Sequence, residues 1–239
     1  MKKMLLIAIG SLSIGFANAQ FTQGQKLIGP SLSFNTNNST EKNNYSQPIY
    51  ERKENATSIG LGFSALKFIS SKKANGWKLN YTFSNFKNTT EALNSTPINF
   101  GKNIRNIHEV GIGYVTRNFI QIKPKLNFYY DVILYGNYNL GESVNESTLA
   151  PSNNYTSTNN GYGISVYITP GFTYQLKKNL IVEAALNSIG SIGYFNSKET
   201  SNDFALNNYE RKYSGFNASS SLTAGSLLSN FWFSIKWIR

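Results

Sequence analysis

The stretch GWKLNYTFS, residues 76–84, alternates strictly between apolar and polar side chains. Successive side chains of a β-strand point to opposite faces, so this stretch predicts a strand with one oily and one polar face. Its two faces consist of Trp77, Leu79, Tyr81 and Phe83 against Lys78, Asn80, Thr82 and Ser84. A strand of this kind lies between a polar and an apolar environment.

The same alternation occurs in eight segments, which are separated by clusters of Gly, Asn, Ser and Lys. We expect strands at about 25–36, 55–68, 76–87, 104–116, 124–139, 160–175, 179–195 and 214–238. The connections alternate between long (37–54, 88–103, 140–159, 196–213) and short (69–75, 117–123, 176–178). Long loops on one side and short turns on the other are typical of membrane barrels. The sequence therefore predicts an all-β fold, an eight-stranded antiparallel up-and-down transmembrane β-barrel.

The N-terminal residues predict export. Lys2 and Lys3 precede an apolar run from Met4 to Phe16 and the small-residue triplet 17–19. This order is that of a signal peptide, and the run is too short for a membrane-spanning helix. We expect cleavage between Ala19 and Gln20, which leaves residues 20–239 as one outer-membrane barrel domain.

The composition also favours a barrel. Charged residues make up 15% of the chain and aromatic residues 14%, with no Cys, and the mean hydropathy is −0.32. Soluble domains carry about 25% charged residues. The polar face of each predicted strand is mostly Gly, Ser, Thr, Asn and Tyr, which suits a narrow interior better than a water-exposed surface. The alternative is a soluble, lipocalin-like barrel with its apolar face inside.

Four segments carry a family resemblance. They are GYGISVYITPGFTYQLKKNLIVEAALNSIGSIGY (161–194), NFWFSIKWIR (230–239), LIGPSLSFN (27–35) and DVILYGNYNLG (131–141). The chain resembles the small bacterial outer-membrane β-barrel domain family, the porin-like barrels of the OmpA, OmpX and OmpW type. The resemblance implies insertion by the outer-membrane assembly machinery, guided by a C-terminal signal. Its residues here would be Phe231, Phe233, Ile235 and Trp237, although Arg239 ends the chain where an aromatic residue is common.

Six charged residues fall on the polar faces of the predicted strands and would project into one lumen. They are Lys78, Glu109, Lys125, Asp131, Glu183 and Lys236. They predict an internal ion-pair network, because an eight-stranded interior is only wide enough for side chains to fill it. The alternative is a gated ion path or a proton relay.

Two further residues give specific expectations. Pro170 lies in the middle of a predicted strand and cannot donate to the ladder, so we expect a bulge or kink there. His108 is the only histidine and would face lipid near the outer rim. Neither a nucleophile motif nor a metal-ligand pattern accompanies it, so we expect no enzyme, metal or cofactor.

The net charge is +11, or +9 once Lys2 and Lys3 are removed. The basic residues form no stripe with aromatics, so nucleic acid is not an expected partner, and outer-membrane lipid is. The leading hypothesis is a non-enzymatic barrel with four polar extracellular loops that serves membrane integrity, adhesion or surface recognition. The loop at 37–54 would be its contact for an extracellular partner. A narrow pore for ions or small solutes and a soluble periplasmic binding barrel remain alternatives.

Overall fold

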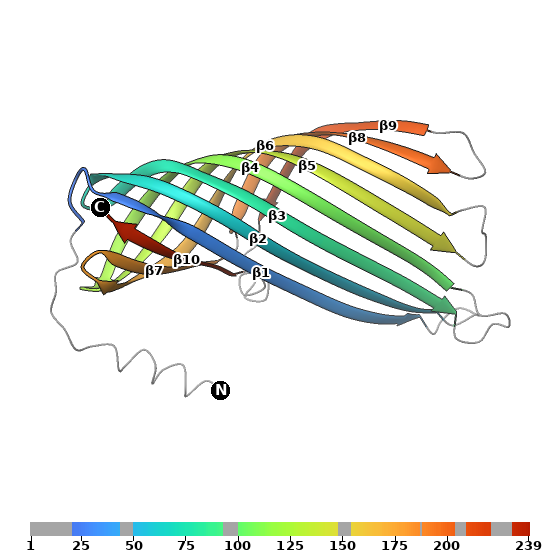
Figure 1. Cartoon of the computed structure of the whole chain (residues 1–239), viewed down its shortest axis with the longest axis horizontal. Coiled ribbons are helices and arrows are strands. Elements are labelled where there is room, and N and C mark those ends of the chain that lie inside the picture. Colours follow the sequence, from blue (N-terminus) through green and yellow to red (C-terminus); the bar gives the residue numbers. More distant parts are fainter. Residues whose placement is uncertain are drawn as a thin grey trace.

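The structure is a computed structural model and describes residues 21–43, 50–92, 100–147, 154–186, 188–203, 209–220 and 231–239. These residues contain ten β-strands, whose arrangement is shown in Figure 1. They are β1 (Lys26–Asn43), β2 (Tyr50–Ser70), β3 (Lys73–Ala92), β4 (Phe100–Lys123), β5 (Leu126–Ser147), β6 (Tyr155–Lys177), β7 (Leu180–Ala185), β8 (Gly190–Asp203), β9 (Tyr209–Ser220) and β10 (Phe231–Ile238). The predicted signal peptide and its cleavage site at Ala19 and Gln20 lie outside the described residues.

Eight of these strands form a closed antiparallel ring. Strands β1 to β6 follow one another, β7 pairs with β6, and β10 lies between β7 and β1. The ring confirms the predicted all-β, up-and-down arrangement. The expected count of eight continuous strands was wrong, because the seventh is divided into β7 and β8 and the eighth into β9 and β10.

The two divided strands change neighbours along the wall. Strand β8 pairs with residues 155–168 of β6, and β9 pairs with β8. In the described part of the chain, β9 and residues 35–43 of β1 each have a hydrogen-bonded neighbour on one edge only. The wall is therefore closed at one end and less complete at the other.

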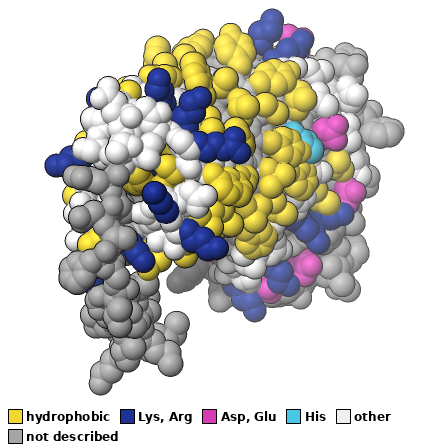
Figure 2. Space-filling model, turned by 60° about the vertical axis from the view of Figure 1, so that its left-hand side comes forward, with side chains coloured by type: hydrophobic (Ala, Val, Ile, Leu, Met, Phe, Trp, Pro, Cys, Tyr) yellow, Lys and Arg dark blue, Asp and Glu magenta, His cyan; other side chains and the backbone are white. Residues whose placement is uncertain are grey.

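The apolar faces point outward, as predicted. Leu61 is 57% exposed and Phe233 61%, and hydrophobic side chains cover most of the wall seen in Figure 2, with charged side chains mainly at its margins. On β5, Leu134 is 50% exposed while its neighbour Ile133 is 1% exposed. The soluble alternative, with the apolar face inside, is thus wrong.

Among the described residues, no helix is long and apolar enough to cross a membrane.

The short connections all lie at one end, the turn end, together with the C terminus (Figure 1). They are the two-residue turns 71–72, 124–125 and 178–179, and a register shift precedes each of them. Such bulges increase the local twist beside a turn. The predicted turn at 117–123 was wrong, since these residues are the last turn-end residues of β4.

The opposite end, the hairpin end, carries strands much longer than predicted. Most of the predicted loop at 37–54 is strand, with Asn43 paired to Tyr50. On β2 the exposed apolar residues run from Ile59 to Ile69, and a tilted membrane strand needs about 9–11 residues. The remaining half of β2, residues 50–58, is polar and forms a ribbon beyond the apolar band.

Ion pairs lie on these polar ribbons, both between neighbouring strands and, for Lys53 with Glu51, along β2. Lys42 and Lys53 lie 3.6 and 3.3 Å from the Glu51 carboxylate, and Lys198 lies 2.8 Å from that of Glu210. Hydrogen bonding to Lys53 lowers the pKa of Glu51. Exposed pairs contribute little stability, so they align the ribbons more than they stabilise the fold.

Pro170 sits opposite the interruption in the neighbouring strand. The β5–β6 register continues through the pair Tyr130 and Pro170 without a shift, so the bulge expected in this strand was wrong. The Pro170 carbonyl accepts from the Leu186 amide at 2.9 Å, where β7 has just ended. A residue of an antiparallel strand directs its N–H and C=O to the same side. The donor that Pro170 lacks would therefore face the break between β7 and β8.

An aromatic cluster fills the lumen at the turn end. Phe21 stacks on Phe68 with ring centroids 4.3 Å apart and contacts Phe119 at 4.9 Å, and Tyr129 lies beside Phe119. Gly24, with φ of +92°, allows the β-turn that folds the chain before β1 back into the mouth. The Gly24 amide then donates to the Phe68 carbonyl at 2.8 Å. The segment before β1 thus closes this end.

Replacement of Phe21 by Ala should destabilise the barrel by about 3 kcal/mol, because it empties a buried aromatic site. Phe216, which is 85% exposed, provides the control, and Phe216→Ala should cost about 0.5 kcal/mol or less. Denaturant unfolding of the refolded protein in detergent measures both. Equal effects of the two substitutions would show that Phe21 does not pack in the mouth.

Candidate functional site in the barrel interior

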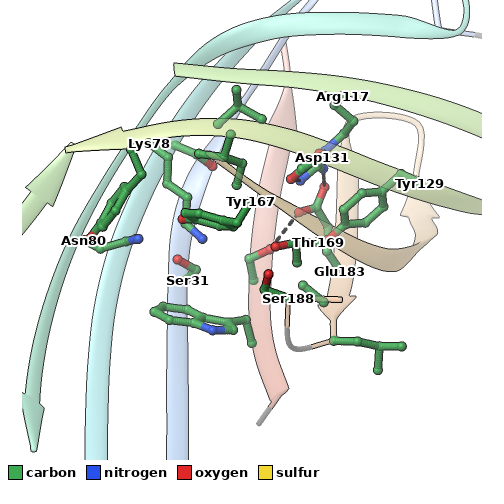
Figure 3. Close-up of a pocket in the computed structure, with 18 of the residues that line it drawn as sticks. Ser31, Lys78, Asn80, Arg117, Tyr129, Asp131, Tyr167, Thr169, Glu183 and Ser188 are labelled. Carbon is green, nitrogen blue, oxygen red and sulfur yellow. Dashed lines mark hydrogen bonds and ion pairs between the residues drawn. The ribbon is translucent and has the colours of Figure 1, made fainter. Parts of the chain in front are cut away.

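A cluster of four charged residues lies on the hairpin side of the aromatic cluster. We call it the charge cluster, and its members are Arg117, Asp131, Glu183 and Lys236. Arg117 donates to both Asp131 oxygens, from Nε at 2.7 Å and from Nη2 at 2.9 Å. Its Nη1 donates to Glu183 Oε1, and Lys236 Nζ lies 2.9 Å from Glu183 Oε2. Ser234 Oγ donates to the same oxygen at 2.9 Å. Figure 3 shows Arg117, Asp131 and Glu183 pointing toward one another.

The charge cluster crosses the barrel. Arg117 and Asp131 are register partners on β4 and β5, whereas Glu183 and Ser234 are partners on β7 and β10. The bond from Arg117 to Glu183 therefore spans the lumen between strands that are not neighbours. Each of the four charged residues is 3–6% exposed. Two positive and two negative charges balance, as buried charges require.

The Arg117 guanidinium also lies over the Tyr129 ring, 3.7 Å from its centroid. This cation–π contact joins the charge cluster to the aromatic cluster below it. A Cβ on Gly171 would meet the Tyr129 ring, so glycine at this position leaves room for the tyrosine. The two clusters together fill the turn-end half of the lumen.

The structure brings together only part of the predicted lumen set. Asp131, Glu183 and Lys236 belong to the charge cluster, whereas Lys78 and Glu109 line the lumen further toward the hairpin end. The expected lumen position of Lys125 was wrong, because Lys125 lies in the turn 124–125, before the first inward residue of β5, Asn127.

Sequence reasoning missed Arg117, the residue that holds the charge cluster together. The signal for it was present, because Arg117 continues the inward series formed by Glu109, Gly111, Gly113 and Val115. The segment 117–123 was assigned to a turn, and the alternation was not followed into it.

Most of the remaining predicted residues lie on the outer wall. Phe233, Ile235 and Trp237 are exposed on β10, and Phe231 pairs in register with Phe34 of β1. Their part in insertion stays a prediction. His108 is also exposed, and its Nδ1 lies 2.8 Å from the Tyr81 hydroxyl oxygen.

A cavity of about 460 Å³ lies on the hairpin side of the charge cluster. Its walls include Lys78, Asn80, Glu109, Tyr135 and Trp232. Tyr135 donates to Glu109 at 3.3 Å and forms an edge-to-face pair with Tyr167, with centroids 5.7 Å apart. Within the described ranges, no group of three or more His, Asp or Glu residues is placed to hold a metal ion.

Comparison of the sequence with known proteins identifies no relative. No known family model matches the sequence. No curated protein sequence matches it either. The structure is similar to the outer membrane protein OprG from Pseudomonas aeruginosa, with 11% identity over 93% of this chain and 99% of that one, at a TM-score of 0.41.

Two other solved structures are similar over most of this chain. Ail, the attachment invasion locus protein of Yersinia pestis, is 12% identical over 91% of this chain and 100% of its own, at a TM-score of 0.29. The translocator domain of the autotransporter NalP from Neisseria meningitidis is 8% identical over 99% and 94%, at a TM-score of 0.37.

Replacement of Arg117 by Ala should destabilise the barrel by about 3–5 kcal/mol, because Asp131 and Glu183 would remain buried with one cation between them. Arg52→Ala is the matched control, since the side chains of Arg52 and Glu54 are about half exposed and their pair should contribute about 0.5 kcal/mol. Denaturant midpoints in detergent compare the two. A loss for Arg117→Ala as small as that for Arg52→Ala would contradict the bracing role.

Proposed function

We propose that the protein is a non-conducting barrel of the bacterial outer membrane that displays polar β-ribbons at the cell surface for recognition or adhesion. The filled turn-end half of the lumen carries this proposal. The aromatic cluster and the charge cluster lie one above the other across an eight-stranded interior, and such an interior leaves little room beside packed side chains.

The orientation follows from the lengths of the connections. Short turns face the periplasm in barrels of this type, and the longer connections face outward. The polar ribbons beyond the apolar band would then stand above the membrane. Regular hydrogen-bonded pairing, such as that of Glu41 with Arg52, keeps a ribbon rigid enough to present side chains to a partner.

The alternatives have less support. A narrow pore would need a continuous path past Arg117 and Phe119, both about 4% exposed. Enzymatic chemistry would need a base beside a nucleophile. His108, the only histidine of the chain, faces outward and bonds Tyr81, so we propose that the barrel is not an enzyme.

Single cysteines test the orientation, since the chain has none of its own. Lys53→Cys on the β2 ribbon should react with a membrane-impermeant maleimide on intact cells. Lys178→Cys, in the turn before β7, should react only after the outer membrane is permeabilised. Both positions are exposed on the protein, so only the membrane barrier should make their reactivity toward the maleimide differ. The reverse pattern would refute the proposed orientation.

Planar-bilayer recording tests the absence of conduction. The refolded wild-type protein should give no steady channel openings, because two packed layers obstruct the lumen. The double variant Phe21→Ala/Arg117→Ala should gain openings, since each layer loses a member. Heat-modifiable gel mobility establishes that each sample is folded. Reproducible openings from the wild type would favour the narrow pore instead.

A further inference from the structure

The cavity on the hairpin side of the charge cluster contains a positive charge that the fold leaves unmatched. Lys78 Nζ lies 4.5 Å from the centroid of the Trp232 ring. Among the described residues, no carboxylate lies within 4.0 Å of it, whereas the charge cluster balances itself below. Glu109, the other acid on the cavity wall, accepts a hydrogen bond from Tyr135. Lys78 is thus free to bind an anion. An anion would stabilise its ammonium group, because burial deprives that group of water.

Two buried acceptors lie in the wall of the same cavity, over Gly62. Ser31 Oγ and Asn80 Oδ1 are shielded from solvent and have no hydrogen-bond partner in the described structure. Figure 3 shows Ser31, Lys78 and Asn80 around one space, and all three residues line the cavity. A buried oxygen without a donor is costly, and Asn80 Oδ1 can only accept. A ligand that fills the cavity should therefore bring hydroxyl groups.

Glycines and aromatic rings shape the wall around these groups. A Cβ at Gly62 would lie 2.5 Å from Ser31 Oγ and 2.6 Å from Asn80 Oδ1, and one at Gly60 would lie 3.0 Å from the Trp232 ring. Glycine at both positions therefore keeps the polar atoms and the indole in place. Flat rings beside hydroxyl and amide groups suit a ligand with both apolar C–H faces and polar edges.

From these features we propose that the cavity binds a small polyhydroxylated carboxylate, a uronate-type sugar acid. Its carboxylate pairs with Lys78, and its ring packs near Trp232. Its hydroxyls donate to the Ser31 and Asn80 oxygens once these side chains turn from Gly62 toward the ligand. Because the aromatic and charge clusters fill the turn end, the ligand enters from the hairpin end. A free sugar acid and the end of an acidic polysaccharide share this chemistry.

Glucuronate titration into refolded wild-type protein, followed by tryptophan fluorescence and calorimetry, tests the site. We expect saturable binding that is at least tenfold weaker in Lys78→Met, because a charge-assisted contact is lost. Lys78→Arg should retain most of the affinity. Lys53→Met, on the β2 ribbon, should leave it unchanged, and glucose should bind far more weakly than glucuronate.

A polyglucuronate sample distinguishes the two sources of ligand. Binding of the monomer alone supports a free sugar acid, and binding of the polymer alone supports the end of a polysaccharide. Absence of saturable binding of either probe to folded wild-type protein would overturn the proposal. Equal affinity of Lys78→Met and wild type, with both folded by heat-modifiable mobility, would overturn the assignment of Lys78.

Discussion

Backbone hydrogen bonding in a medium without water constrains every level of this structure. Each N–H and C=O within the hydrocarbon needs a partner from a neighbouring strand, and only a closed ring provides one for every strand. The pairing of β1 with β10 completes that ring. Once closed at eight strands, the wall encloses an interior that side chains can fill. The charge cluster and the aromatic cluster are two ways of filling it.

The interior combines large and small side chains on neighbouring strands. Tyr135 lies against Gly111 and Tyr129 lies against Gly171, so a ring from one strand occupies the space that the next leaves empty. Across β1, Trp232 of β10 likewise lies against Gly60 of β2 and shapes the cavity beside Lys78. The glycines that weaken the alternation in the sequence are thus the positions over which the aromatic rings pack.

The sequence predicted the faces of the strands better than their ends. Alternation depends on the side-chain period alone, so the inward position of Asp131 and the outward position of Leu134 could be read directly. Ends depend on tertiary pairing, which is why Arg117 was assigned to a turn and Lys125 to the lumen. The break between β7 and β8 also left no local signal, although Pro170 on the adjacent strand indicated where a donor would be missing.

The pairing of the first strand with the last sets an order of events during biogenesis. The seam between β1 and β10 cannot form until the residues of β10, Phe231–Ile238, have been delivered. Lys236 arrives on that same strand, and without it Arg117 alone would face two acids. The nascent interior thus holds surplus negative charge until the final strand docks. Geometric closure and electrical neutrality are reached in a single step, which makes an incomplete chain unfavourable on both counts.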